Sequence, residues 1–254
     1  MNASKLALLA AALLALGAVP ARADKTEKIE ELVNLHDLKT SVAVGDFYLK
    51  QQALLAVRAY LAKTGREQGL GPEWNPSNPY WKEAEEALMQ SMMKEINRKF
   101  SNLEWLSEEW AELDRREFSE ADIDVLLRHM KTEVGRKQVM IVDHGVSVHV
   151  MGALTFTGKL QYELPGTEAE RARMQELYNA EDDAMRFDIQ ENPEGTRFAM
   201  SKVGKKYFVN TILKVSGMIS RRIDQTAATL PAELQTKAGE AQAAVEAYRK
   251  AKSG

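Results

Sequence analysis

Carboxylates are among the side chains of this sequence that could perform catalysis, and the 254 residues include no cysteine. Without a thiol there is no cysteine nucleophile, no disulfide framework and no cysteine-ligated metal centre. The adjacent acids Glu181 and Asp182 are the candidates for a hydrolase that cleaves cell-wall glycans. Such an enzyme needs one carboxyl group with a raised pKa in an apolar cleft. Acidic pairs on amphipathic helices are by default a solvated face, and we favour that interpretation.

The four histidines lack the spacing of a metal site. His144 and His149 are five residues apart, so a helix places them on different faces and a strand on opposite sides. A zinc-binding helix carries its histidines at i and i+4. His36 lies in an apolar helical stripe and is expected to be a partly buried packing residue. Because a Gly-x-Ser-x-Gly elbow is also missing, we predict no catalytic residue, no metal and no cofactor.

An aromatic, proline-rich loop most directly suggests a ligand. The segment from Gly71 to Trp81 holds Trp74, Tyr80 and Trp81 among three prolines. These rings could form a platform that stacks on sugars or on a proline-rich peptide. Alternatively, Trp74 and Trp81 anchor a long loop to the helices beneath it, which packing energetics favour. Trp74, Tyr80 and Trp81 are therefore the candidate ligand-binding residues.

Residues 1–23 predict a secretory signal peptide. Lys5 supplies a positive charge, an apolar run extends from Leu6 to Val19, and Ala21-Arg22-Ala23 matches an A-x-A cleavage pattern. The apolar run is too short for a stable membrane-spanning helix. We expect a periplasmic protein with no stable membrane insertion after cleavage. The formal net charge of −3 gives no general attraction to nucleic acid or anionic lipid.

The elements that must position these residues are expected to be helices. Apolar residues recur at helical spacing along most of the chain, and the counts of 15 glycines and 7 prolines favour long helices over a turn-rich β-fold. We predict an all-α, multi-helix bundle of helical hairpins. It forms one compact unit, or two halves that comprise residues 24–117 and 118–254.

Capping signals locate the helix starts. Asn78-Pro79, Ser119, Thr167 and Asn192-Pro193 each combine N-cap or first-turn residues typical of a helix N-terminus. Pro231 is expected to begin the last helix, whose narrow, alanine-rich stripe would dock lightly or bind a partner helix.

The periodicity also predicts where the first helices lie. The opening helix is expected to run from Lys28 through Phe47, and a second helix is expected to end at Gly65.

The stretch from Val139 to Leu164 fits two patterns. As a helix, Val142, Val146 and Val150 share one face. As strands, alternating apolar residues around Gly158-Lys159 would form a small β-hairpin within residues 143–164, which β-branched enrichment supports. Its length and helical neighbours favour the helix.

Three segments of similar sequence suggest an internal repeat. Each places a helical stretch before a glycine and a basic residue, at Gly65, Gly135 and Gly204, which are 70 and 69 residues apart. Glycine permits a close helix approach, and a cation suits the carbonyl end of a helix. The alternative is coincidence.

The middle segment also carries a family resemblance. Phe118-Ser119-Glu120-Ala121-Asp122-Ile123, followed by residues 129–137, resembles a bacterial secreted family known only as a domain of unknown function. That family's signature is a capped helix running into Phe-Tyr-x-Thr-Pro-x-Gly-Lys-Lys. Thr132, Gly135, Arg136 and Lys137 match it, whereas His129-Met130 replaces the aromatic pair and Glu133 the proline. The resemblance implies a small, exported helical domain with no activity attached.

Together these features predict an exported, non-catalytic module that binds an envelope protein, a glycan or a peptide. The alternatives are a cell-wall hydrolase that uses helix-borne carboxylates, and a carrier that holds an apolar ligand between helices.

Overall fold

The computed structural model describes residues 24–160 and 192–253, together with residues 168, 169, 171, 172, 175, 176 and 179. Every regular element that it describes is a helix, which confirms the predicted all-α bundle. The expected signal peptide, the Glu181-Asp182 pair and most of the helix expected from Thr167 lie outside the described residues.

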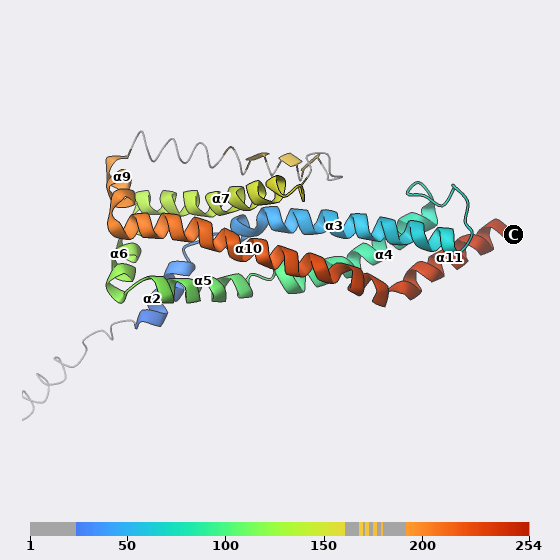
Figure 1. The fold of residues 1–254 in the computed structure, drawn as a ribbon, viewed down its shortest axis with the longest axis horizontal. Coiled ribbons are helices and arrows are strands. Elements are labelled where there is room, and N and C mark those ends of the chain that lie inside the picture. Colours follow the sequence, from blue (N-terminus) through green and yellow to red (C-terminus); the bar gives the residue numbers. More distant parts are fainter. Residues whose placement is uncertain are drawn as a thin grey trace, which may run out of the picture.

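Three long helices form the centre of the elongated molecule. They are α3 (Leu38–Glu67), α7 (Glu133–Phe156) and α10 (Lys202–Thr236), and each packs against the other two. The colour order along the chain shows that all three run in the same direction (Figure 1). Parallel neighbours need long return connections, so the rest of the chain must carry the backbone back between them.

Each long helix follows a short one across a tight corner. The short helices are α2 (Lys25–Val33), α6 (Glu120–Met130) and α9 (Pro193–Met200). The N-cap side chain of Ser119 and the carboxylate of Asp122 form the expected capping box of α6. Pro193 begins α9 as predicted, with Asn192 as its N-cap.

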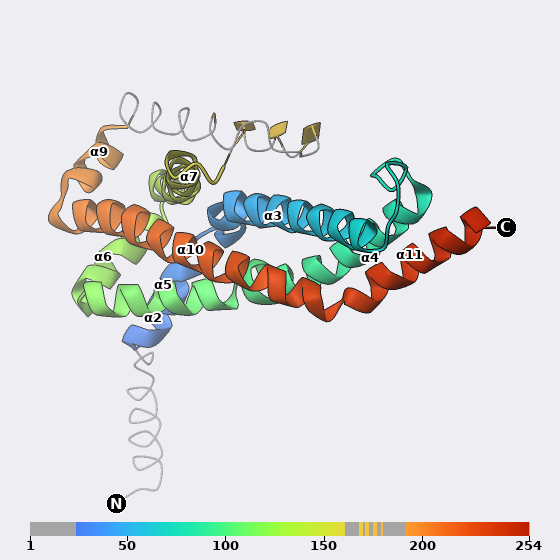
Figure 2. The same cartoon turned by 45° about the vertical axis from the view of Figure 1, so that its right-hand side comes forward.

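The return path from α3 consists of three consecutive elements: α4 (Pro79–Ile96), the π-helical turn η1 (Asn97–Ser101) and α5 (Glu104–Glu117). They run opposite to α3 (Figure 2). The predicted start of α4 is confirmed, because the Asn78 side chain accepts hydrogen bonds from the backbone N–H groups of Tyr80 and Trp81. The C-terminal helix α11 (Ala238–Ser253) packs on α4 and α3, so its alanine-rich face is occupied within the chain.

Apolar stripes of these helices merge into a shared hydrophobic core, to which both of the expected halves contribute. The largest fully buried side chains include Trp110, Tyr207, Phe100, Ile29, Leu32, Leu49, Leu61 and Leu88. Among the described residues, α7 is the helix whose length and composition would allow it to span a membrane, but 44% of its apolar window is buried inside the protein.

The alternative β-hairpin within residues 143–164 does not form over its described part, where the favoured helix is confirmed. Residues 143–156 belong to α7, and a turn follows at Thr157-Gly158. Val142, Val146 and Val150 are buried on one face of α7, so helix packing outweighs the β-propensity of the valines. Residues 161–164 lie outside the described part.

Three helix boundaries also differ from those expected. The opening helix is interrupted at residues 34–37, where Asp37 becomes the N-cap of α3. No helix ends at Gly65, which lies inside α3. Pro231 lies inside α10 rather than at the start of a helix. Leu230 and Leu234 on either side of Pro231 are buried, so core packing carries the helix through a residue that lacks a backbone N–H donor.

Candidate functional site

A buried hydrogen-bonded triad connects the three long helices. His36 lies in the corner before α3, Asp143 on α7 and Tyr207 on α10. His36 Nδ1 is 2.7 Å from Asp143 Oδ1, and His36 Nε2 is 2.7 Å from the Tyr207 hydroxyl. The second oxygen of Asp143 accepts the backbone N–H of Asp37 at 2.8 Å. Asp143 thus holds the α2–α3 corner through two separate bonds.

Burial affects the protonation of Tyr207 in the triad. It raises the pKa of Tyr207 well above its ordinary value, and the nearby Asp114 and Asp143 raise it further. Tyr207 therefore keeps its proton, and its hydroxyl forms a hydrogen bond with Nε2 of His36, whose Nδ1 bonds to Asp143. The side chains of His36 and Asp143 are only 0% and 3% exposed. The polar atoms of the triad thus bond to one another and are closed to a substrate.

Two polar groups beside the triad have no hydrogen-bond partner in the part of the chain that the structure describes. The Trp110 indole lies 4.1 Å from the His36 ring, centroid to centroid, yet its Nε1 is buried without a hydrogen-bond partner. Asp114, one turn further along α5, is completely buried and both of its oxygens lack hydrogen bonds. Burial raises the pKa of Asp114 to about 7, with a smaller rise from Glu117 and an opposing effect of His36. Asp114 is the acid of this cluster that can stay protonated near neutral pH.

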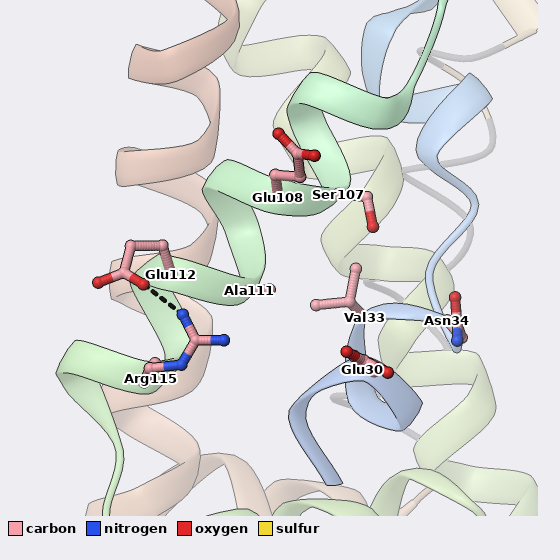
Figure 3. A pocket seen from close by; sticks show the side chains of 8 residues that line it. All are labelled: Glu30, Val33, Asn34, Ser107, Glu108, Ala111, Glu112 and Arg115. Carbon is pink, nitrogen blue, oxygen red and sulfur yellow. Dashed lines mark hydrogen bonds and ion pairs between the residues drawn. The ribbon is translucent and has the colours of Figure 1, made fainter. Parts of the chain in front are cut away.

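An open cleft of about 440 Å³ lies between α2 and the outer side of α5 (Figure 3). Glu30, Val33 and Asn34 line it from α2, while its other walls come from α5. The α5 residues that line it are Ser107, Glu108, Ala111, Glu112 and Arg115. Glu112 forms an ion pair with Arg115, whereas no ion pair of Glu30 or Glu108 is found among the described residues.

A second hollow of about 730 Å³ is lined by residues of α3, α4 and η1. Met89 and Met93, four residues apart on α4, contribute thioether side chains to its lining, and Asp46, Lys50 and Glu86 are among the charged residues there. Ser101 of η1 donates a hydrogen bond to Asp46 at 2.6 Å. This groove is wide and open, and its charged residues have both signs.

The sequence-predicted residues Trp74, Tyr80 and Trp81 meet in an aromatic cluster with Tyr248 of α11. Trp74 lies 5.5 Å from Trp81 and from Tyr248, centroid to centroid, and Tyr80 lies 5.9 Å from Tyr248. Trp74 and Trp81 are buried, and Tyr80 is half-buried.

The two indole N–H groups are both used inside the protein. Trp74 Nε1 donates to the Leu61 carbonyl at 3.0 Å, and Trp81 Nε1 donates to Glu85 at the same distance. A methyl group at Gly65 would lie 2.1 Å from Trp74 Cδ1, so this glycine makes room for the ring. This geometry is that of a loop anchor; a ligand-binding role of Trp74, Tyr80 and Trp81 stays a prediction.

Sequence reasoning missed the triad. His36 is not a partly buried packing residue, because it is closed from solvent and bonded through both nitrogens. Its partner Asp143 is 107 residues away, so no local spacing connects the two. The usable signal was a carboxylate at helical spacing from apolar residues: Asp114 follows Trp110 by four residues, and Asp143 precedes Val146 by three.

The remaining histidines stay apart from one another. His144 is half-buried on α7, where burial lowers its pKa, and His149 is exposed. Within the described ranges, no group of three or more histidine, aspartate or glutamate side chains is arranged to hold a metal ion.

Comparison of the chain with protein-family models, curated proteins and solved structures finds no match. The triad and the α2–α5 cleft are therefore the features from which a function can be proposed.

Proposed function

We propose that the protein is an exported, non-catalytic interaction module that binds a cationic segment of an envelope partner in the α2–α5 cleft. The observation that carries this proposal is the cleft itself, an open hollow in which the carboxylates of Glu30 and Glu108 have no ion-pair partner among the described residues. His36 and Asp143 are already bonded to neighbours, so they serve to join helices rather than to act on a substrate.

The charge of the cleft selects the partner. Glu30 projects from α2 and Glu108 from α5, and neither has an ion-pair partner in the described part of the chain. Arg115 is paired with Glu112 and does not offset them. A lysine or arginine side chain entering the cleft would meet two carboxylates, and such complementarity gives specificity and faster association.

Peptide binding tests the proposal directly. Fluorescence anisotropy at low salt would compare a lysine-containing dodecapeptide with the same peptide carrying glutamate in place of lysine. We expect binding of the lysine peptide alone, weakening as salt is added because exposed charges are screened.

Charge-matched variants then locate the site. Glu30→Gln with Glu108→Gln should weaken binding, whereas Glu83→Gln with Glu246→Gln removes two exposed charges elsewhere and should not. Equal effects of the two pairs would show that the attraction comes from net charge rather than from the cleft.

Export rests on residues 1–23, and its test is separate. The mature protein isolated from the periplasm should begin at Asp24. Retention of Met1 in a cytoplasmic fraction would contradict this part of the proposal.

Asp114 favours a second candidate, the cell-wall hydrolase, because its pKa is raised to about 7 in an apolar setting. Its complete burial keeps it from a glycan. Incubation with purified peptidoglycan distinguishes the two functions. Release of muropeptides by the wild type but not by Asp114→Asn would favour the hydrolase.

A further inference from the structure

Asp114 lies on the face of α5 that packs against the rest of the protein. One side of α5 lines the cleft through Ala111 and Arg115. The other side buries Trp110 and Asp114 beside His36. Any outward movement of α5 therefore changes the cleft and uncovers Asp114 in one step.

Among the described residues, no hydrogen-bond donor reaches the carboxylate of Asp114. A buried carboxylate without a donor is stable only when neutral, because an isolated charge in the interior is costly. We propose that Asp114 is a pH-dependent latch that seats α5 when protonated and releases it when ionised. The consequence for partner binding rests on the function proposed above.

The lysines of the surrounding elements bond to groups other than Asp114, and His36 offsets only part of the rise in the pKa of Asp114. Lys25 of α2 donates to the Arg115 carbonyl at 2.9 Å, and Lys214 of α10 pairs with Glu117 at 2.7 Å. Lys206 of α10 donates to the Glu117 carbonyl. His36 and Tyr207 are bonded to each other, and Asp143 adds a further negative charge on α7. None of these groups forms a hydrogen bond with Asp114.

The direction of the effect follows from linkage. The pKa of Asp114 is 3.8 when exposed and about 7 when α5 is seated. The seated state therefore binds the proton more tightly, and it is favoured at low pH. Between these two values each unit of pH increase should raise the ratio of released to seated α5 by about tenfold, with a plateau above pH 7.

Hydrogen–deuterium exchange of the full chain between pH 5 and pH 8 tests the latch. After correction for the intrinsic pH dependence of exchange, the wild-type amides of α5 should open about tenfold more for each unit from pH 5 to pH 7. Asp114→Asn cannot ionise, so its corrected opening should not vary with pH. Glu112→Gln removes a charge from the outer side of α5 and should behave as the wild type.

Two results would overturn the latch. One is a corrected pH dependence that is the same in the wild type and in Asp114→Asn. The other is a wild-type increase that spreads equally over α7 and α10, which would indicate global unfolding. The wild-type profile needs no variant, so poor folding of Asp114→Asn would not prevent the test.

Anisotropy with the lysine dodecapeptide at pH 5.5 and pH 7.5 tests the link to partner binding. A change of affinity in the wild type that disappears in Asp114→Asn supports regulation of the cleft. Affinity that does not depend on pH while α5 opens overturns that regulation. Failure to bind at any pH overturns the proposed function but leaves the exchange result for the latch intact.

Discussion

The imidazole of His129 lies flat against the ring of Phe198, with centroids 3.6 Å apart and planes inclined by 10°. The two residues occupy the same position in two corners. His129 precedes Gly135 by six residues, and Phe198 precedes Gly204 by six. In both corners the carbonyl of the ring residue accepts the N–H of the N-cap residue, Thr132 or Ser201, at 2.9 Å.

The glycines complete the equivalence of the two corners. The hydroxyls of Thr132 and Ser201 accept the N–H groups of Gly135 and Gly204 at 3.0 Å. The α6–α7 and α9–α10 connections are therefore one structure used twice, with the two copies in contact.

Alanine at either corner glycine should destabilise the fold. A Cβ atom at Gly135 would lie 2.0 Å from the His129 carbonyl oxygen, and one at Gly204 would lie 2.0 Å from that of Phe198. Because these are backbone atoms, the helices must move apart, and overpacking of this kind costs about 1–3 kcal/mol. Urea unfolding of Gly135→Ala and Gly204→Ala measures the loss.

Gly152 supplies the matched control for these substitutions. It lies inside α7, and a Cβ there would meet nothing within 4 Å. Gly152→Ala should raise the free energy of unfolding by about 0.5–1 kcal/mol, because alanine restricts the unfolded chain more than glycine does. A similar loss at all three glycines would show that the corners are not special.

Removal of the Asp143 carboxylate should cost stability in proportion to the two donors that it holds. The carboxylate of Asp143 uses one oxygen for His36 and the other for the backbone N–H of Asp37. The amide in Asp143→Asn keeps only one of these oxygens, so one of the two buried groups loses its partner. We expect a loss of about 2–3 kcal/mol in the free energy of unfolding at pH 7. A loss no larger than that of an average surface substitution would contradict the structural role of the triad.

Tyr207→Phe should cost about 1–2 kcal/mol, because Nε2 of His36 then lacks its buried partner. Tyr60→Phe is the control, since Tyr60 is half-buried and no hydrogen bond of its hydroxyl is found in the described structure. In a double-mutant cycle with Asp143→Asn the losses should not add, because both act on His36. Strict additivity would contradict a shared network.

Asp114 gives the stability of the whole fold a defined pH dependence. Its pKa is raised on folding from 3.8 to about 7, so its contribution is fully present below pH 4 and is lost as the pH rises through 7. Asp114→Asn should match the wild type at pH 4 and exceed it by roughly 2–4 kcal/mol at pH 8. Denaturant unfolding at both values measures this difference. An equal difference at pH 4 and pH 8 would contradict it.

Local signals predicted local structure well. The caps at Asn78, Ser119 and Asn192 form as expected, because each depends on bonds within three residues. Where local signals and the observed structure differ, tertiary packing explains the difference. The valines of α7 follow their buried face rather than their β-propensity, and Pro231 lies between two buried leucines. The repeat is supported at Gly135 and Gly204. It is not supported at Gly65, which lies inside α3 and makes room for the Trp74 ring.

The site could not be predicted in this way. His36 and Asp143 are 107 residues apart in the chain, yet His36 Nδ1 lies 2.7 Å from Asp143 Oδ1. Only the tertiary fold brings them together. The lateral placement of α2 against α5, which creates the cleft, likewise depends on contacts between segments far apart in sequence. Asp114 and Asp143 stand at helical spacing from apolar residues, but the prediction from sequence did not use this signal.

Trp74→Ala should release both the aromatic loop and the C-terminal helix, because the indole contacts Trp81 and Tyr248 and holds the Leu61 carbonyl. We expect a loss of about 3–5 kcal/mol, typical of a buried aromatic residue replaced by alanine. Limited proteolysis should then cut within residues 68–78 and within α11, whereas Trp74→Phe should protect both regions better. Unchanged cleavage sites in Trp74→Ala would contradict the anchoring role. A separate measurement tests ligand binding by the same residues. Quenching of wild-type tryptophan fluorescence by a glycan or a proline-rich peptide would support the ligand-binding prediction.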